Sequence, residues 1–301
     1  MEITYNTSED RPLIITMGNF DGVHCGHQHI IKLAIEKAEN NNCNSTLLTF
    51  NPHPVEVLTQ KKIKKLSSWQ QRKRSFLNLG LDMIILQRFN NSFARIEYKD
   101  FIKQLVNRFN IKEIIVGEDF RCGYQNAGTP EKIAELGNKL EYTLTAVPSV
   151  KIDGRDISST YIRKLLESGK VRLANKLLGK TFAIEAKVIK GDQRGRKLGF
   201  PTANLEPITN YVLPKAGVYA ARIVINNTLY NGVVNLGFRP TFNKDKLSIE
   251  VHIFDFTQCI YEQKLELSFV ERIRGEKKFR NKAELVKTID SDIKQAKEIL
   301  L

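Results

Sequence analysis

The fold of the first half of this 301-residue chain is decided by residues 13–38, LIITMGNFDGVHCGHQHIIKLAIEKA. The apolar run at 13–17 predicts a buried strand. Apolar residues at helical spacing, with lysine and glutamate on the opposite face, predict a helix over about 27–40. The turn between the two elements contains three of the five histidines in the chain.

This turn, GNFDGVHCGHQH at 18–29, leads from a strand into a helix N-terminus. Free backbone N–H groups and the helix dipole favour anions there, and Gly18 and Gly26 let a ligand approach the backbone. Zinc is an alternative, because imidazoles and the Cys25 thiol are zinc ligands, although no C-x-x-C or H-x3-H pair occurs elsewhere. An ordinary packed turn is the third alternative, and the turn alone leaves all three open.

The composition indicates a globular protein of about two domains. Hydrophobic residues make up 42% of the chain, and no apolar run approaches the roughly 20 residues of a membrane span. The N-terminus, MEITYNTSEDRP, has no apolar signal-peptide core. The cysteines are scattered, which predicts free thiols in a reducing cytoplasm. They are Cys25, Cys43, Cys122 and Cys259.

The net charge of +14 raises the question of a nucleic-acid partner. The excess is spread along the chain, with +8 in residues 1–180 and +6 in residues 181–301. The one dense run, KKIKK at 61–65, is better interpreted as a solvated loop than as a binding arm. We therefore expect no nucleic-acid partner and no membrane partner, and a basic protein also suits anionic nucleotides.

Residues 1–150 alternate between strand-like and helical patterns. Strands are predicted at 13–17, 45–50, 83–87, 113–117 and 144–150, and helices near 27–40, 68–79, 97–109 and 130–140. This alternation is typical of an α/β Rossmann-like domain with a parallel sheet, in which ligands bind beyond the carboxyl ends of the strands. A helical pair at about 159–178 completes a first domain, 1–180.

From Thr181 the chain changes to strands separated by turns, at 181–190, 217–226, 229–236, 247–256 and 264–273. Only residues 281–300 return to helical periodicity. The pattern predicts a small antiparallel β-barrel with a C-terminal helix as the second domain, 181–301.

Three more motifs of the first half carry polar groups. TFNPHP at 49–54 holds Asn51 and His53 between stiffening prolines, and VGEDF at 116–120 brings Asp119 to the end of a strand. ISSTYIRKLL at 157–166 begins a helix with three hydroxyl residues. These hydroxyls are good helix caps, or they bind a polyphosphate together with the helix N–H groups and Arg163.

In this order, GNFDGVHCGHQ, TFNPHP, VGEDF and ISSTYIR resemble the adenylyltransferase module of the prokaryotic bifunctional riboflavin kinase/FMN adenylyltransferase (FAD synthetase) family. The resemblance covers about residues 12–180, implies the reaction of FMN and ATP to FAD and pyrophosphate, and disfavours zinc. It implies that the ATP phosphates contact Gly18, Phe20, His24, Gly26, His27, Ser158, Ser159, Thr160 and Arg163, with His24 and His27 catalytic. It places Asn51, His53, Asp119 and Phe120 on the rim nearer nucleotide and flavin.

One departure from the family concerns the flavin side of this module. The stretch FRCGYQNAGT at 120–129 has Cys122 where many relatives have a second aromatic residue, so looser flavin binding is expected. His29 has no counterpart in the family pattern and is expected to face solvent.

Two motifs of the second half suggest metal and proton chemistry. In RGRKLGFPTANL at 194–205, Thr202 and Asn204 lie two residues apart, so on an extended segment both oxygens face one hard cation such as Mg²⁺. A turn with capping polar groups is the alternative. In IEVHIFDF at 249–256, Glu250 lies on the polar face of an alternating strand, as a solvent-facing residue or as a general base for phosphoryl transfer.

The succession GDQRGRKLGFPTANL, GVYAARI, GVVNLGFRPTF and EVHIFDF resembles the riboflavin kinase module of the same family, over about residues 181–290. The resemblance implies phosphorylation of riboflavin by ATP on a six-stranded barrel, with Thr202 and Asn204 as Mg²⁺–ATP ligands and Glu250 as the base. The loop Gly191–Lys197 and the segment Gly237–Thr241, which contains Arg239, would cover nucleotide and flavin. Gly191, Gly199 and Pro201 are implied to bind the ATP phosphates. Glu262, in CIYEQ, replaces a glycine that is common in relatives, so the loop there is expected to differ.

We therefore expect a cytoplasmic bifunctional enzyme that makes FMN from riboflavin and FAD from FMN, with ATP as co-substrate and Mg²⁺ as cofactor. One alternative retains a single activity while the other module only binds flavin. The other is a basic RNA-binding protein, although nothing resembles the lysine-rich second signature of tRNA synthetases. The oligomeric state does not follow from the sequence.

Overall fold

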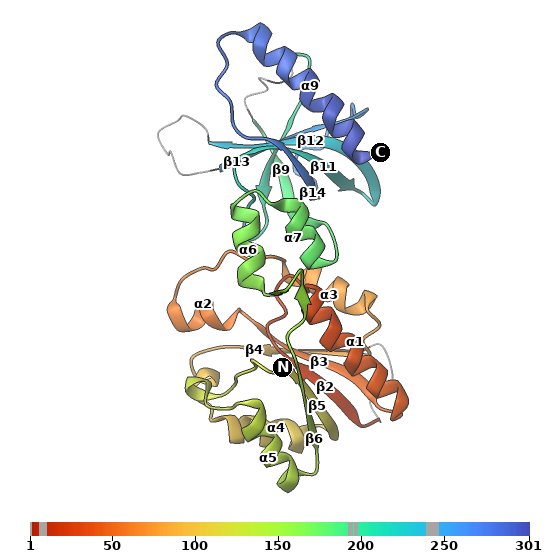
Figure 1. Ribbon diagram of the computed structural model, residues 1–301, viewed down its shortest axis with the longest axis vertical. Coiled ribbons are helices and arrows are strands. Elements are labelled where there is room, and N and C mark those ends of the chain that lie inside the picture. Colours follow the sequence, from red (N-terminus) through yellow and green to blue (C-terminus); the bar gives the residue numbers. More distant parts are fainter. Residues whose placement is uncertain (1, 6–10, 192–194, 196–197, 239–246) are drawn as a thin grey trace. The chain divides into compact units, whose positions relative to one another are not determined.

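The computed structural model describes residues 2–5, 11–191, 195, 198–238 and 247–301 (Figure 1). By its contacts the chain divides into two compact units, the first made of 1–63 and 69–158 and the second of 64–68 and 159–301. The helical pair at 159–178 therefore groups with the barrel by contacts. The functional boundary near residue 180 stays a prediction.

The first unit is built on a six-stranded sheet, as the strand–helix alternation predicts. Its strands are β1 (Glu2–Tyr5), β2 (Leu13–Met17), β3 (Asn44–Asn51), β4 (Met83–Arg88), β5 (Ile111–Gly117) and β6 (Thr143–Val147). They lie in the order β1-β4-β3-β2-β5-β6, and β2 to β6 are parallel. Only β1, which pairs antiparallel with β4, was not predicted. The strand order reverses between β2 and β5, so the turn after β2 lies at the switch point where such sheets bind ligands.

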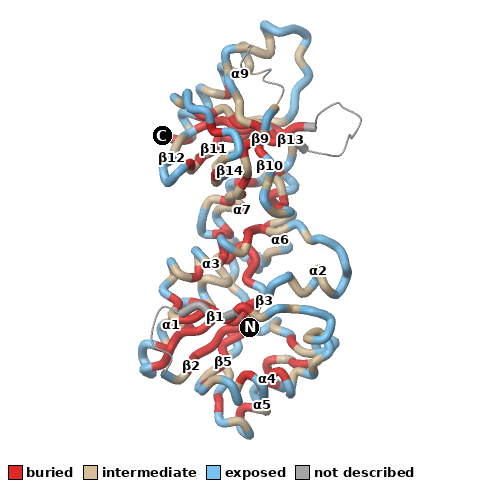
Figure 2. The backbone as a smooth tube through the Cα atoms, turned by 180° about the vertical axis from the view of Figure 1, so that it is seen from behind, coloured by how far each residue is buried: buried red, intermediate tan, exposed pale blue. Residues whose placement is uncertain are grey.

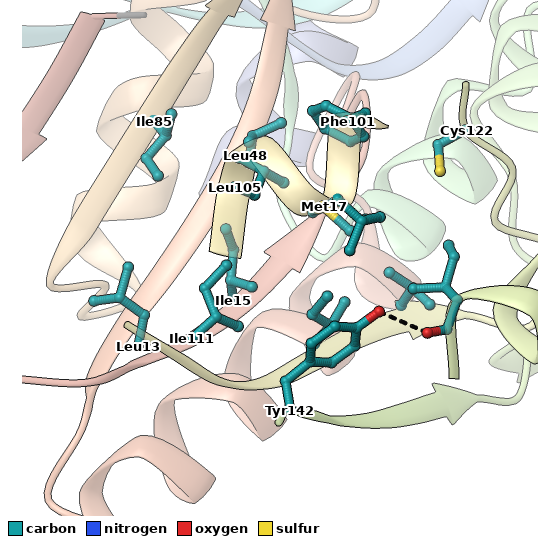
Figure 3. Packing of buried hydrophobic residues seen from close by; sticks show 14 of the residues in the cluster. Leu13, Ile15, Met17, Leu48, Ile85, Phe101, Leu105, Ile111, Cys122 and Tyr142 are labelled. Carbon is teal, nitrogen blue, oxygen red and sulfur yellow. Dashed lines mark hydrogen bonds between the residues drawn. The ribbon is translucent and has the colours of Figure 1, made fainter. Parts of the chain in front are cut away.

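Helices cover both faces of this sheet because the strands are apolar on both sides. The helices are α1 (Cys25–Asn40), α2 (Pro54–Thr59), α3 (Trp69–Asn78), α4 (Tyr98–Arg108) and α5 (Pro130–Leu140), with short 3₁₀ turns at Phe93–Arg95 and Tyr124–Asn126. Leu13, Ile15 and Met17 pack with residues of α4 and α5 (Figure 3), whereas Ile14 packs with α1. Each such buried side chain contributes about 1.5–3 kcal/mol of hydrophobic stabilisation.

The second unit begins with α6 (Ser159–Glu167) and α7 (Val171–Leu178), which follow a small hairpin, β7 (Lys151–Ile152) and β8 (Arg155–Asp156). Six antiparallel strands then close a barrel in the order β10-β13-β12-β11-β14-β9, as the family resemblance implies. They are β9 (Phe182–Ile189), β10 (Ala203–Pro207), β11 (Gly217–Ile225), β12 (Thr228–Phe238), β13 (Leu247–Ile253) and β14 (Lys264–Arg274). Buried and half-buried residues alternate along β9, so one face fills the barrel (Figure 2).

The C-terminal helix α9 (Lys282–Leu300) packs on the outside of the barrel. Its Ala296 and Leu300 are buried against Val218 and Val233 of the strands. The Arg274 guanidinium on β14 donates two parallel hydrogen bonds to the buried Asp292 carboxylate on α9, with nitrogen–oxygen distances of 2.9 and 2.8 Å. This bidentate pair fixes the rotation of the helix on the barrel.

A short segment of the first half, residues 64–68, belongs to the second unit. The Lys65 N–H donates to the Asn210 carbonyl at 2.8 Å, and the Val212 N–H donates to the Lys65 carbonyl at 2.9 Å. The Ser68 hydroxyl donates to the Glu185 carboxylate on β9 at 2.5 Å. The expected solvated loop is thus partly correct, because the side chains of 61, 62 and 64 are exposed while the backbone of Lys65 is paired.

Candidate active sites

The histidine turn is built around the N-terminus of α1. The helix begins at Cys25, and the Nδ1 atom of His24 caps it by accepting the backbone N–H of His27 at 3.3 Å. The rings of His24 and His27 stack with their centroids 3.5 Å apart. Because Nδ1 of His24 accepts a hydrogen bond, it carries no proton, and the ring can donate only from Nε2. His29, two residues on, is exposed on the helix, as expected.

The backbone of this turn is tightly constrained. A Cβ atom added at Gly26 would lie 3.3 Å from the His24 ring, and one added at Gly18 would lie 3.2 Å from the Phe20 ring. Phe20 and Val23 adopt left-handed φ angles of 49° and 48°, which cost roughly 1–2 kcal/mol each for residues with a Cβ. Such strain is typical of functional loops, where the surrounding contacts hold it in place.

The Phe20 side chain packs between the turn and α3. Its ring is 3% exposed and lies edge-on to His27, with the centroids 5.1 Å apart, and to Phe76 of α3. Phe20 is thus part of the core as well as a predicted phosphate-binding position, and contact between its backbone and ATP stays a prediction.

Arg72 of α3 holds the same turn and was missed by the sequence analysis. It is only 8% exposed, and its guanidinium donates to the Asn19 carbonyl at 2.7 Å. Burial lowers the pKa of Arg72, an effect that the charge of Asp21 opposes. Nothing in QQRKR distinguishes Arg72 from Arg74, which is exposed, so only the fold reveals it.

The predicted rim residues lie at the carboxyl ends of parallel strands. Asn51 is the last residue of β3, and Asp119 comes two residues after β5 ends at Gly117. His53 caps α2, because its Nδ1 accepts the Val55 N–H at 3.2 Å. Parallel strands end at one edge of a sheet, so the topology brings these side chains and the turn after β2 to the same edge.

The aromatic rim position Phe120 and the substituted position Cys122 are both drawn into the core. Phe120 packs against the cluster that includes α4 and α5, and Cys122 is 9% exposed within that cluster. Burial raises the pKa of the Cys122 thiol to about 12. Cys122 is therefore a packing residue in this structure, and its effect on flavin binding stays a prediction.

The hydroxyl motif divides between the units. Ser158 is exposed and ends the first unit, whereas Ser159, Thr160 and Arg163 belong to α6 of the second. Arg163 Nε donates to the backbone carbonyl of Lys64 at 2.8 Å. That these residues bind the same ATP as the histidine turn stays a prediction.

The barrel brings three oxygen-bearing side chains into register. Glu250 on β13 lies directly opposite Asn204 on β10 and directly opposite Asn235 on β12. Directly opposed residues project to the same face with Cβ atoms about 4.5–5.5 Å apart. The structure thus joins Asn204 and Glu250, which were predicted, and adds Asn235, which the alternation of GVVNLG could have indicated.

Two glycines bring the backbone close to side chains of this face. A Cβ atom at Gly191 would lie 2.0 Å from the Asn204 side chain, and one at Gly195 would lie 3.0 Å from the Thr202 hydroxyl. Gly199 has a φ of +90°, a conformation that residues with a side chain rarely adopt. The backbone therefore approaches Thr202 and Asn204 more closely than any other residue type allows.

The oxygens of Thr202, Asn204 and Glu250 are of the kind that Mg²⁺ prefers. Across the described ranges, no three His, Cys, Asp or Glu side chains form a group able to hold a metal ion. Because the protein oxygens on this face are few, they fit a Mg²⁺ ion that is bound mainly by ATP phosphates and water.

Two other predictions concern the barrel loops. Arg239 and parts of the segments at 191–197 and 237–241 lie outside the described residues. Glu262 adopts a left-handed φ of 66°, a conformation that glycine favours, and forms an ion pair with Lys187. The expected difference of this loop from the family pattern stays a prediction.

Comparison with known families matches two parts of the chain to two families. The model of the FAD synthetase family matches residues 6–161, and that of the riboflavin kinase family matches residues 178–300. The Bifunctional riboflavin kinase/FMN adenylyltransferase of Bacillus subtilis is 37% identical over 96% of this chain and 92% of its own length. The protein of the same name from Escherichia coli K12 is 33% identical over 95% of this chain and 92% of its own.

A solved structure resembles the whole chain. A crystal structure from Streptococcus pneumoniae, described as a macrolide-efflux protein, matches with a TM-score of 0.88 and 29% identity, covering 97% of this chain and 96% of that one. In the part of the chain that the structure describes, no helix is both long and apolar enough to cross a membrane.

Proposed function

This chain belongs to the family of bifunctional riboflavin kinase/FMN adenylyltransferases, and we propose that its barrel face phosphorylates riboflavin while its histidine turn supports adenylyl transfer to FMN. The first reaction converts riboflavin and ATP to FMN and ADP. The second converts FMN and ATP to FAD and pyrophosphate. The observation that carries the assignment is the register of Glu250 between Asn204 and Asn235, because it combines a base with two amides on one face.

In the kinase reaction, Glu250 takes the proton of the riboflavin hydroxyl as that oxygen attacks the γ-phosphorus of ATP. Thr202 and Asn204 are the residues that would hold Mg²⁺–ATP. When bound, Mg²⁺ neutralises charge on the phosphates. The close approach of Gly191 to Asn204 and of Gly195 to Thr202 supports the proposal that the backbone at these two glycines helps to exclude water from the transferred group.

Adenylyl transfer needs no base, because the FMN phosphate is already anionic when it attacks the α-phosphorus in line. Catalysis then rests on orientation and on groups that stabilise developing charge. The N-terminus of α1 and the Nε2–H of His24 supply such groups, with His27 stacked beside it. Asn51, His53 and Asp119 are proposed to contact nucleotide and flavin at the strand ends.

The resemblance alone supports the role of Ser158, Ser159, Thr160 and Arg163 at the β/γ end of ATP. We also propose the functional division 1–180 and 181–301. All four cysteines are free thiols, which supports a reducing, cytoplasmic location.

Chromatography of products tests these assignments. The purified chain with riboflavin, ATP and Mg²⁺ should release FMN first and then FAD, and with FMN and ATP it should release FAD and pyrophosphate. Removal of Mg²⁺ by EDTA should stop FMN formation, and excess Mg²⁺ should restore it. Undiminished FMN formation in EDTA would contradict the metal assignment, and FMN that never becomes FAD would favour the single-activity alternative.

A further inference from the structure

His252 on β13 makes a hydrogen bond that the proposed chemistry does not use. Its Nδ1 atom lies 2.8 Å from the backbone carbonyl oxygen of Pro201. A carbonyl oxygen only accepts, so Nδ1 carries the proton and donates it. The imidazole also lies edge-on to Phe200, with ring centroids 6.0 Å apart, and beside Phe254 at 5.8 Å.

This hydrogen bond holds a segment that lies just before the strand pairing of the barrel begins. Strand pairing of β10 begins only at Ala203, which lies opposite Val251. Pro201 has no N–H to donate, and its side chain is exposed. The bond from His252 therefore ties the chain to β13 immediately before Thr202.

His252 lies two residues beyond Glu250, so both side chains project from the same face of β13. One strand thus carries the proposed base and the group that anchors the Thr202 turn. A movement of the turn by about 1 Å would misplace the Thr202 hydroxyl, and errors of that size can cost about 10²-fold in rate.

We propose that His252 is a positioning residue of the kinase reaction, whose Nδ1–H holds the Pro201 carbonyl so that Thr202 faces the same ligand as Asn204. The proposal rests on the proposed role of Thr202 in binding Mg²⁺–ATP. The Nδ1–H is committed to the carbonyl, and the proposed base of the reaction remains Glu250.

Two substitutions in the full-length chain separate this role from others. Asparagine carries its side-chain N–H at the position of histidine Nδ1, whereas glutamine carries it at the position of Nε2. His252→Asn should therefore keep kcat and the KM for Mg²⁺–ATP within about twofold. His252→Gln should raise that KM about tenfold and lower kcat, because a lost hydrogen bond weakens the anchor by up to about tenfold.

A binding measurement provides a readout other than turnover. Isothermal titration calorimetry with Mg²⁺–ADP should give a dissociation constant about tenfold weaker for His252→Gln than for His252→Asn. The rate of FAD formation from FMN should stay at the parental value in both variants, and a parental midpoint of thermal unfolding should report that the barrel is folded.

A comparison with Thr202→Ala separates the two proposals. If His252 acts through Thr202, the double variant Thr202→Ala/His252→Gln should bind Mg²⁺–ADP no more weakly than Thr202→Ala alone. Equal binding by His252→Asn and His252→Gln, at parental strength or weakened alike, would overturn the positioning role of His252. Parental binding by Thr202→Ala would instead overturn the proposed metal role of Thr202.

Discussion

The two nucleotide sites differ in how the chain assembles them. The histidine turn is continuous, since the cap His24, Gly26 and His27 fall within four residues at the start of α1. The barrel face is discontinuous, since Asn204, Asn235 and Glu250 come from three strands that only the closed barrel aligns. The first depends on the end of a helix, which supplies N–H groups wherever it forms. The second depends on strand register, in which a slip of one residue would turn each side chain to the opposite face.

This difference predicts which substitutions reduce only one of the two activities. A substitution in the turn should affect one chemistry through a local change, whereas a substitution on the barrel face should affect the other through the loss of one donor. The following variants are ordered by the size of the expected effect.

Glu250→Gln should have the largest effect, because it keeps the size of the side chain and removes the base. We expect the rate of riboflavin phosphorylation to fall about 10²–10⁴-fold, the usual range for loss of a general base. Adenylylation of supplied FMN should continue at close to the parental rate. Initial rates with each substrate measure both effects, and equal loss of the two activities in a folded protein would mean that they share one site.

His27→Ala tests the other site. It removes the ring that stacks on His24, and we expect FAD formation to fall about 10²–10³-fold, as for loss of one preorganised electrostatic group. FMN formation should be unchanged. His29→Ala is the matched control, because His29 lies two residues away and is exposed. Stoichiometric zinc in the parent that disappears in His27→Ala would restore the metal alternative.

Thr202→Ala sharpens the comparison within the barrel. It removes one of few protein oxygens from the proposed Mg²⁺–ATP site, so kinase activity should fall about tenfold, and added Mg²⁺ should recover part of it. Thr202→Ser keeps the hydroxyl and should retain most of the activity. A Mg²⁺ titration of the initial rate measures both variants, and full activity in Thr202→Ala would reduce the motif to a turn.

Arg72→Met tests whether the histidine turn keeps its shape without the hydrogen bond from α3. It removes the shorter of two hydrogen bonds to the Asn19 carbonyl and leaves the one from the Thr49 hydroxyl at 3.3 Å. We therefore expect about 1–2 kcal/mol of lost stability and a few-fold higher KM for ATP in FAD formation. Arg74→Met, on an exposed position of the same helix, is the control. Thermal unfolding and initial rates measure the effects. An unchanged KM would show that the turn holds its shape without α3.

The sequence pattern identified the five parallel strands and their helices because both faces of the sheet are strongly apolar and the helices are amphipathic. It missed α2, because PVEVLT is short and begins at the second of two closely spaced prolines. It also missed β1, an edge strand with one partner. The role of His53 as the N-cap of α2 could not be predicted either, since histidine is an uncommon N-cap residue.

In the barrel, the alternation of apolar residues located five strands, whereas β10 was recognised only as an extended segment. This strand follows the turn formed by Gly199, Phe200 and Pro201. Its five residues are too few to show a clear alternation of apolar and polar side chains. The neighbours of Glu250 depend on which strands pair, and pairing across a closed barrel is not encoded in any single segment. The pairing of Asn235 with Glu250 and the bond from His252 to Pro201 therefore required the structure, while the Thr202–Asn204 spacing did not.

The pairing of residues 64–68 with the second unit has a consequence for synthesis on the ribosome. This segment emerges about ninety residues before α6, so its partners Tyr211 and Glu185 do not yet exist when the sheet of the first unit can form. Because the second unit is assembled from two separate stretches, the contacts of residues 64–68 must wait until the chain has been made as far as Val212. A gene fragment that starts at residue 159 would encode the second unit without residues 64–68, which belong to it by their contacts. The sequences of the two units are therefore interleaved, which a simple fusion of two complete genes would not require.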